Sequence, residues 1–171
     1  MGLDLLAHFY KDEVMKVVAI DSKTGKEVIS NIADPDPSFF SFIGGVELSD
    51  EQIRSKIDRM NVSADVKSLL YSFSKTTIKA GKALLKIGRK IIDILFSLIR
   101  AFPNVTFGVI FGLVVGALIA AIPLIGFVLG SLATSIAVAF GFIMGAKADF
   151  EAGDIGARID ALVAEFAPLR T

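Results

Sequence analysis

Hydrophobic and polar positions divide this chain into two unlike parts. Residues 105–146 form a run of 42 positions without Asp, Glu, Lys, Arg or His, whereas the rest mixes apolar and charged positions. A membrane-spanning helix needs about 20 mainly apolar residues, and Pro123 divides the run into stretches of 18 and 23 residues. A single helix over the whole run would be about twice as long as the hydrocarbon layer is thick. The pattern therefore predicts a transmembrane helical hairpin over residues 104–146, with Pro123 at its apex.

Burial of the same hairpin inside protein is the alternative to a membrane location. Pore-forming colicins keep a hydrophobic helical hairpin inside a water-soluble domain until it inserts. This sequence resembles them in that architectural feature alone, over about a quarter of the chain and without a shared motif. Burial of this kind requires several surrounding amphipathic helices, and the flanking segments supply about three. The membrane-embedded arrangement is therefore the favoured hypothesis.

Basic residues recur with helical spacing in residues 63–100. At 100° per residue, seven of them fall within about 60° of one direction, and apolar side chains such as Val66, Leu70 and Ile91 lie opposite. The pattern predicts one long cationic amphipathic helix at the membrane interface, where it would contact anionic lipid headgroups. The alternative is a bundle helix whose lysines face water. The predicted headgroup contacts are Lys75, Lys79, Lys82, Lys86, Arg89, Lys90 and Arg100.

The charged flanks contain further predicted elements. Residues 14–30 alternate around a turn containing Gly25, which predicts a β-hairpin. Pro35 and Pro37 then predict an irregular linker, whose phenylalanines either pack on neighbouring elements or dip into the membrane surface. A helix is expected from Ser49, because Ser49 and Gln52 have the spacing of a capping box. The apolar stripe that begins at Ile155 predicts a short C-terminal helix.

The predicted fold class is a mainly α membrane protein. A glycine-rich two-helix transmembrane hairpin follows a long cationic amphipathic helix and a small N-terminal α+β cytoplasmic part with the β-hairpin. The predicted segments are 1–47 for the N-terminal part with its linker, 48–103 for the cytoplasmic and interfacial helices, 104–146 for the hairpin and 147–171 for the C-terminal cytoplasmic helix. Basic residues flank the run on both sides, which places both termini in the cytoplasm of a multi-pass inner-membrane protein.

Small residues are regularly spaced along both halves of the apolar run. In lipid, helices associate through close packing along such small-residue faces, as in a glycine zipper. One row is explained by packing within the hairpin, whereas two rows favour a homo-oligomer, of which a ring is one form. The predicted helix-packing and oligomerisation residues are Gly108, Gly112, Gly116, Gly126, Gly130, Gly141 and Gly145.

Composition argues against several classes of chemistry. The chain has no cysteine, which excludes disulfides and thiolate metal sites, and its one histidine, His8, is expected to be structural. Neither Gly25-Lys26 nor the segment from Gly81 to Lys90 has the spacing of a phosphate-binding loop. We therefore predict no catalytic residue, no metal ligand and no cofactor, and the protein is not expected to be an enzyme. The basic block beside an apolar block favours lipid over nucleic acid as partner.

The function predicted from these patterns is a small self-associating membrane protein that forms a homo-oligomeric channel or pore, or that permeabilises the bilayer. The spans contain no ionisable residue, so a pore would be narrow and apolar. The alternatives are a membrane anchor or scaffold subunit with a cytoplasmic protein partner, and a phage holin-like lysis protein.

Overall fold

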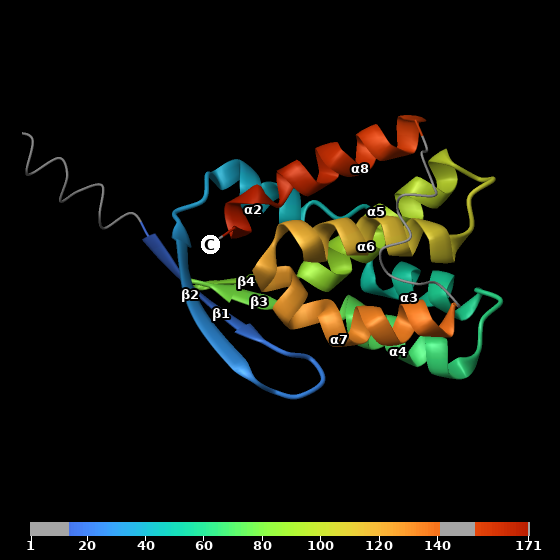
Figure 1. Ribbon diagram of the computed structural model, residues 1–171, viewed down its shortest axis with the longest axis horizontal. Coiled ribbons are helices and arrows are strands. Elements are labelled where there is room, and N and C mark those ends of the chain that lie inside the picture. Colours follow the sequence, from blue (N-terminus) through green and yellow to red (C-terminus); the bar gives the residue numbers. More distant parts are fainter. Residues whose placement is uncertain (1–13, 141–152, 171) are drawn as a thin grey trace, which may run out of the picture.

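The computed structural model describes residues 14–140 and 153–170. These residues form an antiparallel sheet of four strands at one end of a group of helices, and α6 lies between α8 on one side and α7 with α4 on the other (Figure 1). The fold is therefore α+β.

The sheet joins two hairpins that are far apart in sequence. Strands β1 (Val14–Ile20) and β2 (Glu27–Ala33) form the first, as predicted, and β3 (Ile78–Ala80) and β4 (Ala83–Leu85) form the second. The strand order is β2-β1-β3-β4, because β1 also pairs with β3. Alternate residues point inward, so that Val17 and Ala19 of β1 and Ile78 of β3 are buried on one face.

Seven helices and one 3-10 turn complete the described residues. They are α2 (Pro37–Gly44), α3 (Asp50–Asp58), α4 (Ala64–Ser74), α5 (Ile87–Ala101), α6 (Phe107–Ala121), α7 (Pro123–Ala139), α8 (Gly153–Glu165) and η2 (Ala167–Leu169). The capping box predicted at the start of α3 is present, because the Ser49 hydroxyl accepts from the backbone N–H of Gln52 and the Gln52 side chain accepts from that of Ser49.

The predicted transmembrane hairpin is wrong for the described residues. Helix α6 has 15 residues and α7 has 17, about 22 and 26 Å at 1.5 Å per residue. Within residues 14–140 and 153–170, no helix combines the length and apolar character needed to cross a bilayer. The prediction of a multi-pass inner-membrane protein with transmembrane helices is therefore not supported.

The two apolar helices pack against other protein elements where contact with lipid was predicted. Helix α6 packs against α5 and α8, and α7 packs against α4 and β1. Ile110 and Phe111 of α6 and Val128 and Leu129 of α7 are fully buried. An apolar run marks a helix that loses contact with water, but apolar side chains fit a protein core as well as lipid. Helices α4, α5 and α8 and strand β1 supply the covering that the sequence pattern had predicted to be insufficient.

Polar groups of α7 contact the turn of the first hairpin. The Ser131 hydroxyl lies 3.2 Å from a carboxylate oxygen of Asp21, and the Lys23 ammonium donates to the Ser135 hydroxyl at 2.9 Å. The Ser22 hydroxyl also donates to the backbone carbonyl of Val128 at 3.1 Å. This side of α7 therefore meets polar protein groups instead of acyl chains.

The long cationic helix predicted for residues 63–100 is also wrong. The segment forms α4, the β3–β4 hairpin and α5, and Gly81 adopts a positive φ of 58° in the turn between the strands. β-branched Thr76, Thr77 and Ile78 favour an extended chain after α4. A helical projection superposed three elements that do not share an axis, so the single cationic face does not exist.

The segment predicted to be an irregular linker contains a helix. Pro37 occupies the first turn of α2, where its missing N–H removes no hydrogen bond, and the Asp36 side chain caps the helix by accepting from the N–H of Ser38. Phe39 is buried in the core, and the ring of Phe42 packs against that of Phe166 at a centroid distance of 5.2 Å. These phenylalanines therefore pack on neighbouring elements, which is the first of the two predicted alternatives.

Candidate functional site

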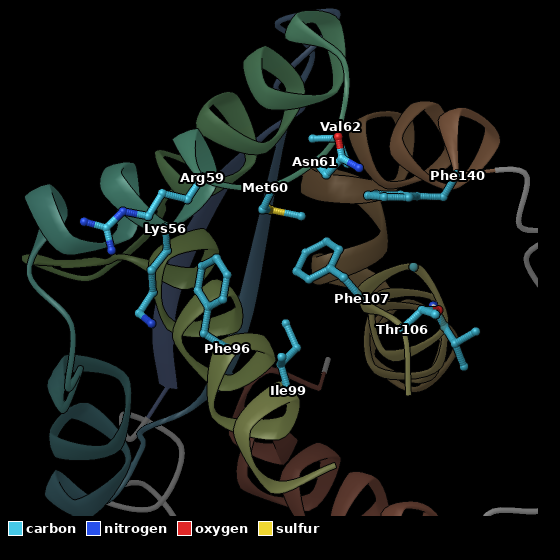
Figure 2. A pocket seen from close by; sticks show the side chains of 12 residues that line it. Lys56, Arg59, Met60, Asn61, Val62, Phe96, Ile99, Thr106, Phe107 and Phe140 are labelled. Carbon is cyan, nitrogen blue, oxygen red and sulfur yellow. The ribbon is translucent and has the colours of Figure 1, made fainter. Parts of the chain in front are cut away.

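A large cavity in the described part of the chain lies between α3, α5, α6 and the end of α7. Its volume is about 860 Å3, which is within the range of small-molecule sites. Figure 2 shows the side chains of Met60, Phe96 and Phe107 facing a common space, with Phe140 beyond Phe107. We call this space the aromatic pocket. Its lining residues are Lys56, Arg59, Met60, Asn61, Val62, Phe96, Ile99, Thr106, Phe107, Gly108, Val109 and Phe140.

Phenylalanine rings form the base of the aromatic pocket. The ring centroid of Phe107 lies 6.1 Å from that of Phe96, 6.1 Å from that of Phe111 and 5.6 Å from that of Phe140. These separations are within the range in which aromatic pairs attract one another. The pocket therefore offers a preformed apolar surface, on which a flat or flexible apolar group can replace water.

Local sequence signals fix the walls of this pocket. Helix α6 begins at Phe107 because the hydroxyl of Thr106 accepts from the backbone N–H of Val109. A side chain at Gly108 would meet the Phe140 ring at 3.3 Å, so the glycine allows α6 and the end of α7 to approach closely here. Helix α3 ends at Asp58, and Arg59 serves as its C-cap before the chain turns through Met60.

Charge at the aromatic pocket is entirely positive. Lys56 and Arg59 are the charged residues in its lining, and their charged ends lie on the α3 side, away from Phe107 (Figure 2). The Lys56 ammonium stands 5.6 Å from the centroid of the Phe96 ring. The salt bridges within residues 14–140 and 153–170 involve neither Lys56 nor Arg59. The pocket margin therefore carries two cations available for an anionic group.

The predicted glycine rows occupy different environments. Gly112 is buried, and a β-carbon at Gly126 would lie 3.3 Å from the side chain of Ile119 across the α6–α7 turn. Gly130 has open space around the position of a side chain. Gly108 lines the aromatic pocket, Gly116 is half-buried, and Pro123 is the first residue of α7. Gly141, Gly145 and His8 lie outside the described residues. Self-association through these residues stays a prediction.

The predicted headgroup contacts are distributed over four elements. Lys75 is the C-cap of α4, Lys79 lies on β3, Lys82 in the following turn, and Lys86 is the N-cap of α5. Arg89, Lys90 and Arg100 belong to α5. Arg89 pairs with Asp50 at 3.2 Å and Arg100 with Glu47 at 2.9 Å. The structure does not bring the seven together.

Lys90 is buried, with 8 % of its surface exposed, although its pattern predicted contact with headgroups. Its ammonium donates to the Gly45 carbonyl at 2.9 Å and stands 4.5 Å from the centroid of the Phe42 ring. Desolvation by burial lowers the pKa of Lys90 below its ordinary value of 10.5, and the charges of Asp93, Glu47 and Glu165 oppose that shift. Lys90 therefore stabilises the contact between α5 and the α2–α3 loop.

Lys90 should make stability depend on pH in the alkaline range. The pKa of Lys90 is lower in the folded state, so between that pKa and 10.5 the Lys90 amine is protonated more often in the unfolded chain than in the folded one. The contribution of Lys90 to the free energy of unfolding therefore rises with pH over this range. In Lys90→Met this contribution is absent. We expect the free energy of unfolding of the wild type to increase relative to that of Lys90→Met over this range. Denaturant titrations at matched pH values measure the difference, and parallel pH profiles for the two proteins would contradict the assignment.

The sequence pattern did not reveal the aromatic pocket, although Gly108 was among the predicted helix-packing residues. Phe107 belongs to the predicted hairpin, whereas Phe96 and Lys56 belong to two different predicted helices, so no local pattern connects them. The pore, anchor and lysis hypotheses depended on a hairpin that spans the membrane, and the described residues contain no helix able to do so. Comparisons of the chain with protein-family models, with curated proteins and with solved structures found no significant match.

Proposed function

We propose that this protein binds an apolar organic monoacid in the aromatic pocket. The observation that carries the proposal is a cavity of about 860 Å3 with phenylalanine walls and a margin of Lys56 and Arg59. The apolar body of the ligand lies against Phe96 and Phe107, and its acidic group meets the two cations at the α3 side. Sites of this kind combine a mainly apolar lining with a few polar groups that orient the ligand.

The two parts of the pocket contribute differently to this proposal. Removal of apolar ligand surface from water supplies most of the affinity, at about 25 cal/mol per Å2 before the costs of association. The two cations at the margin supply selectivity for an acid, because ion pairs that stay in contact with water contribute about 0.2–1 kcal/mol each. The proposed function is therefore binding, and the absence of catalytic activity stays a prediction from the sequence.

Two fluorescent probes with the same rings test the proposal. Anilinonaphthalenesulfonate carries an anionic group, and phenylnaphthylamine lacks it. We expect both to bind in saturable fluorescence titrations, with the sulfonate bound more tightly. Lys56→Gln combined with Arg59→Gln should weaken sulfonate binding by about three- to tenfold and leave the neutral probe unaffected. Lys16→Gln combined with Lys26→Gln is the charge-matched control, because both lysines are exposed and neither lines the pocket.

A variant that fills the pocket separates this site from adventitious binding. Met60 is half-buried in the wall, and Met60→Trp introduces a larger side chain into the cavity. It should displace both probes while the circular dichroism spectrum and the unfolding midpoint stay close to those of the wild type. Unchanged binding of both probes to a folded Met60→Trp protein would refute the proposal, as would equal effects of the two lysine-containing double variants.

A further inference from the structure

A second cavity, of about 360 Å3, lies on another side of the described structure, between α3, the end of α4 and the start of α5. It shares no lining residue with the aromatic pocket. Four basic residues line it, together with the hydroxyl-bearing Tyr71, Ser74 and Thr77, and with Asp50 as its one acid. We call it the basic pocket. Its basic residues are Arg54, Lys75, Lys86 and Arg89.

Positive charge in the basic pocket exceeds negative charge by three. Asp50 pairs with Arg89 at 3.2 Å, which balances one of the four cations. Within residues 14–140 and 153–170, no salt bridge forms at Arg54, Lys75 or Lys86. Like charges around one small cavity repel one another, and an anion with more than one negative charge removes that repulsion. A monovalent carboxylate would balance the site less completely than a phosphate.

Two basic side chains of this pocket are held in place by other protein groups. The Arg89 guanidinium donates to the backbone carbonyl of Leu48 at 3.1 Å, in addition to its pairing with Asp50. The Arg54 guanidinium carbon stands 5.6 Å from the centroid of the Tyr71 ring, and the Tyr71 hydroxyl donates to Asp58, which does not line the cavity. Arginine held in this way loses little freedom when it binds an oxyanion.

The start of α5 is electrostatically unfavourable without a ligand. A helix N-terminus carries partial positive charge, which acidic side chains normally balance. The first turn of α5 contains no acidic residue, its N-cap is Lys86, and no side chain caps it. Lys86 and Arg89 thus add positive charge beside a positive helix end, and both line the same cavity. An oxyanion in the basic pocket would offset this repulsion as well as that among the side chains.

From the cavity and its charges we infer that the basic pocket binds a small molecule that bears a phosphate group. The phosphate lies among Arg54, Lys75 and Lys86, and the hydroxyls of Ser74 and Thr77 offer further polar contacts. The rest of the ligand is small, because the cavity holds about 360 Å3. This binding site is separate from the aromatic pocket and does not depend on the function proposed for it.

Inorganic phosphate is the probe for this site. Isothermal titration calorimetry at constant ionic strength should show saturable binding of one phosphate per chain, and acetate should not saturate over the same concentrations. Arg54→Gln combined with Lys75→Gln should weaken phosphate binding by about three- to tenfold. Both residues are exposed, so the variant should keep the circular dichroism spectrum and unfolding midpoint of the wild type.

Lys79→Gln combined with Lys82→Gln is the matched control. It removes the same charge from the exposed face of the neighbouring hairpin, outside the lining of the basic pocket. Its phosphate affinity should stay within about twofold of that of the wild type. Absence of saturable phosphate binding would overturn the inference, and so would an equal loss in the two double variants. Phosphate binding without binding of the naphthalene probes would support the basic pocket alone.

Discussion

Replacing Gly88 with alanine should strongly destabilise the protein. A β-carbon at this position would lie 1.8 Å from the carbonyl oxygen of Phe73 and 2.9 Å from its carbonyl carbon. The Gly88 N–H also donates to the Thr76 carbonyl at 3.0 Å, so the start of α5 lies directly on the backbone at the end of α4. We expect a loss of about 3 kcal/mol or more, because backbone atoms cannot turn aside as a side chain can.

Gly130→Ala is the matched control for this variant. Gly130 lies in the interior of α7, and nothing stands within 4 Å of the position of its β-carbon. Alanine is the better helix former, so this variant should gain about 0.5–1 kcal/mol. Chemical denaturation followed by circular dichroism measures both free energies of unfolding. A Gly88→Ala protein as stable as the wild type would show that α4 and α5 do not approach one another in this way.

Asp93→Ala should cause the second large loss. Asp93 is 6 % exposed, and its carboxylate accepts from the backbone N–H of Leu48 at 3.1 Å and from that of Glu47 at 3.4 Å. Alanine leaves the buried N–H of Leu48 without this partner, and it removes a negative charge that favours the charged form of Lys90. Each effect is costly in a buried site. We expect a loss of about 3 kcal/mol in the free energy of unfolding.

Two further variants separate the contributions of Asp93. Asp93→Asn keeps one acceptor oxygen and loses the charge, so its loss should be smaller than that of Asp93→Ala. Asp93→Ala combined with Lys90→Met removes both charges, and its loss should be smaller than the sum of the two single losses. Surface substitutions usually change the free energy of unfolding by no more than about 0.5 kcal/mol. A change as small as this for Asp93→Ala would contradict the role of Asp93.

Patterns confined to a few neighbouring residues were read correctly from the sequence. The β-hairpin follows from alternation around a glycine turn, and the start of α3 follows from the contact between Ser49 and Gln52. The C-terminal stripe is also buried where it was expected, at Ile155 and Ile159 of α8. These features involve contacts within one element or between adjacent ones, so nearby residues contain the information that determines them.

The two sites could not be predicted in the same way. The aromatic pocket brings together Phe96, Phe107 and Phe140 from three helices. The basic pocket joins Arg54 to Lys75, whose helices meet only after the chain folds. Lys75, Lys86 and Arg89 were recognised as basic but were placed on one helical stripe that would contact lipid headgroups. The sequence shows that these side chains are basic. The close approach of α4 and α5 at Gly88 determines which of the basic side chains line the basic pocket.

By itself, the sequence determined that the apolar run forms two helices that bury most of their large side chains and that the chain turns at Pro123. The tertiary structure decided what replaces the water. Helices α4, α5 and α8 and strand β1 cover α6 and α7, as the buried Phe111 and Val128 show. The physical reason is that hydropathy measures the cost of contact with water. It does not distinguish the side chains of a protein core from lipid, because both remove apolar surface from water.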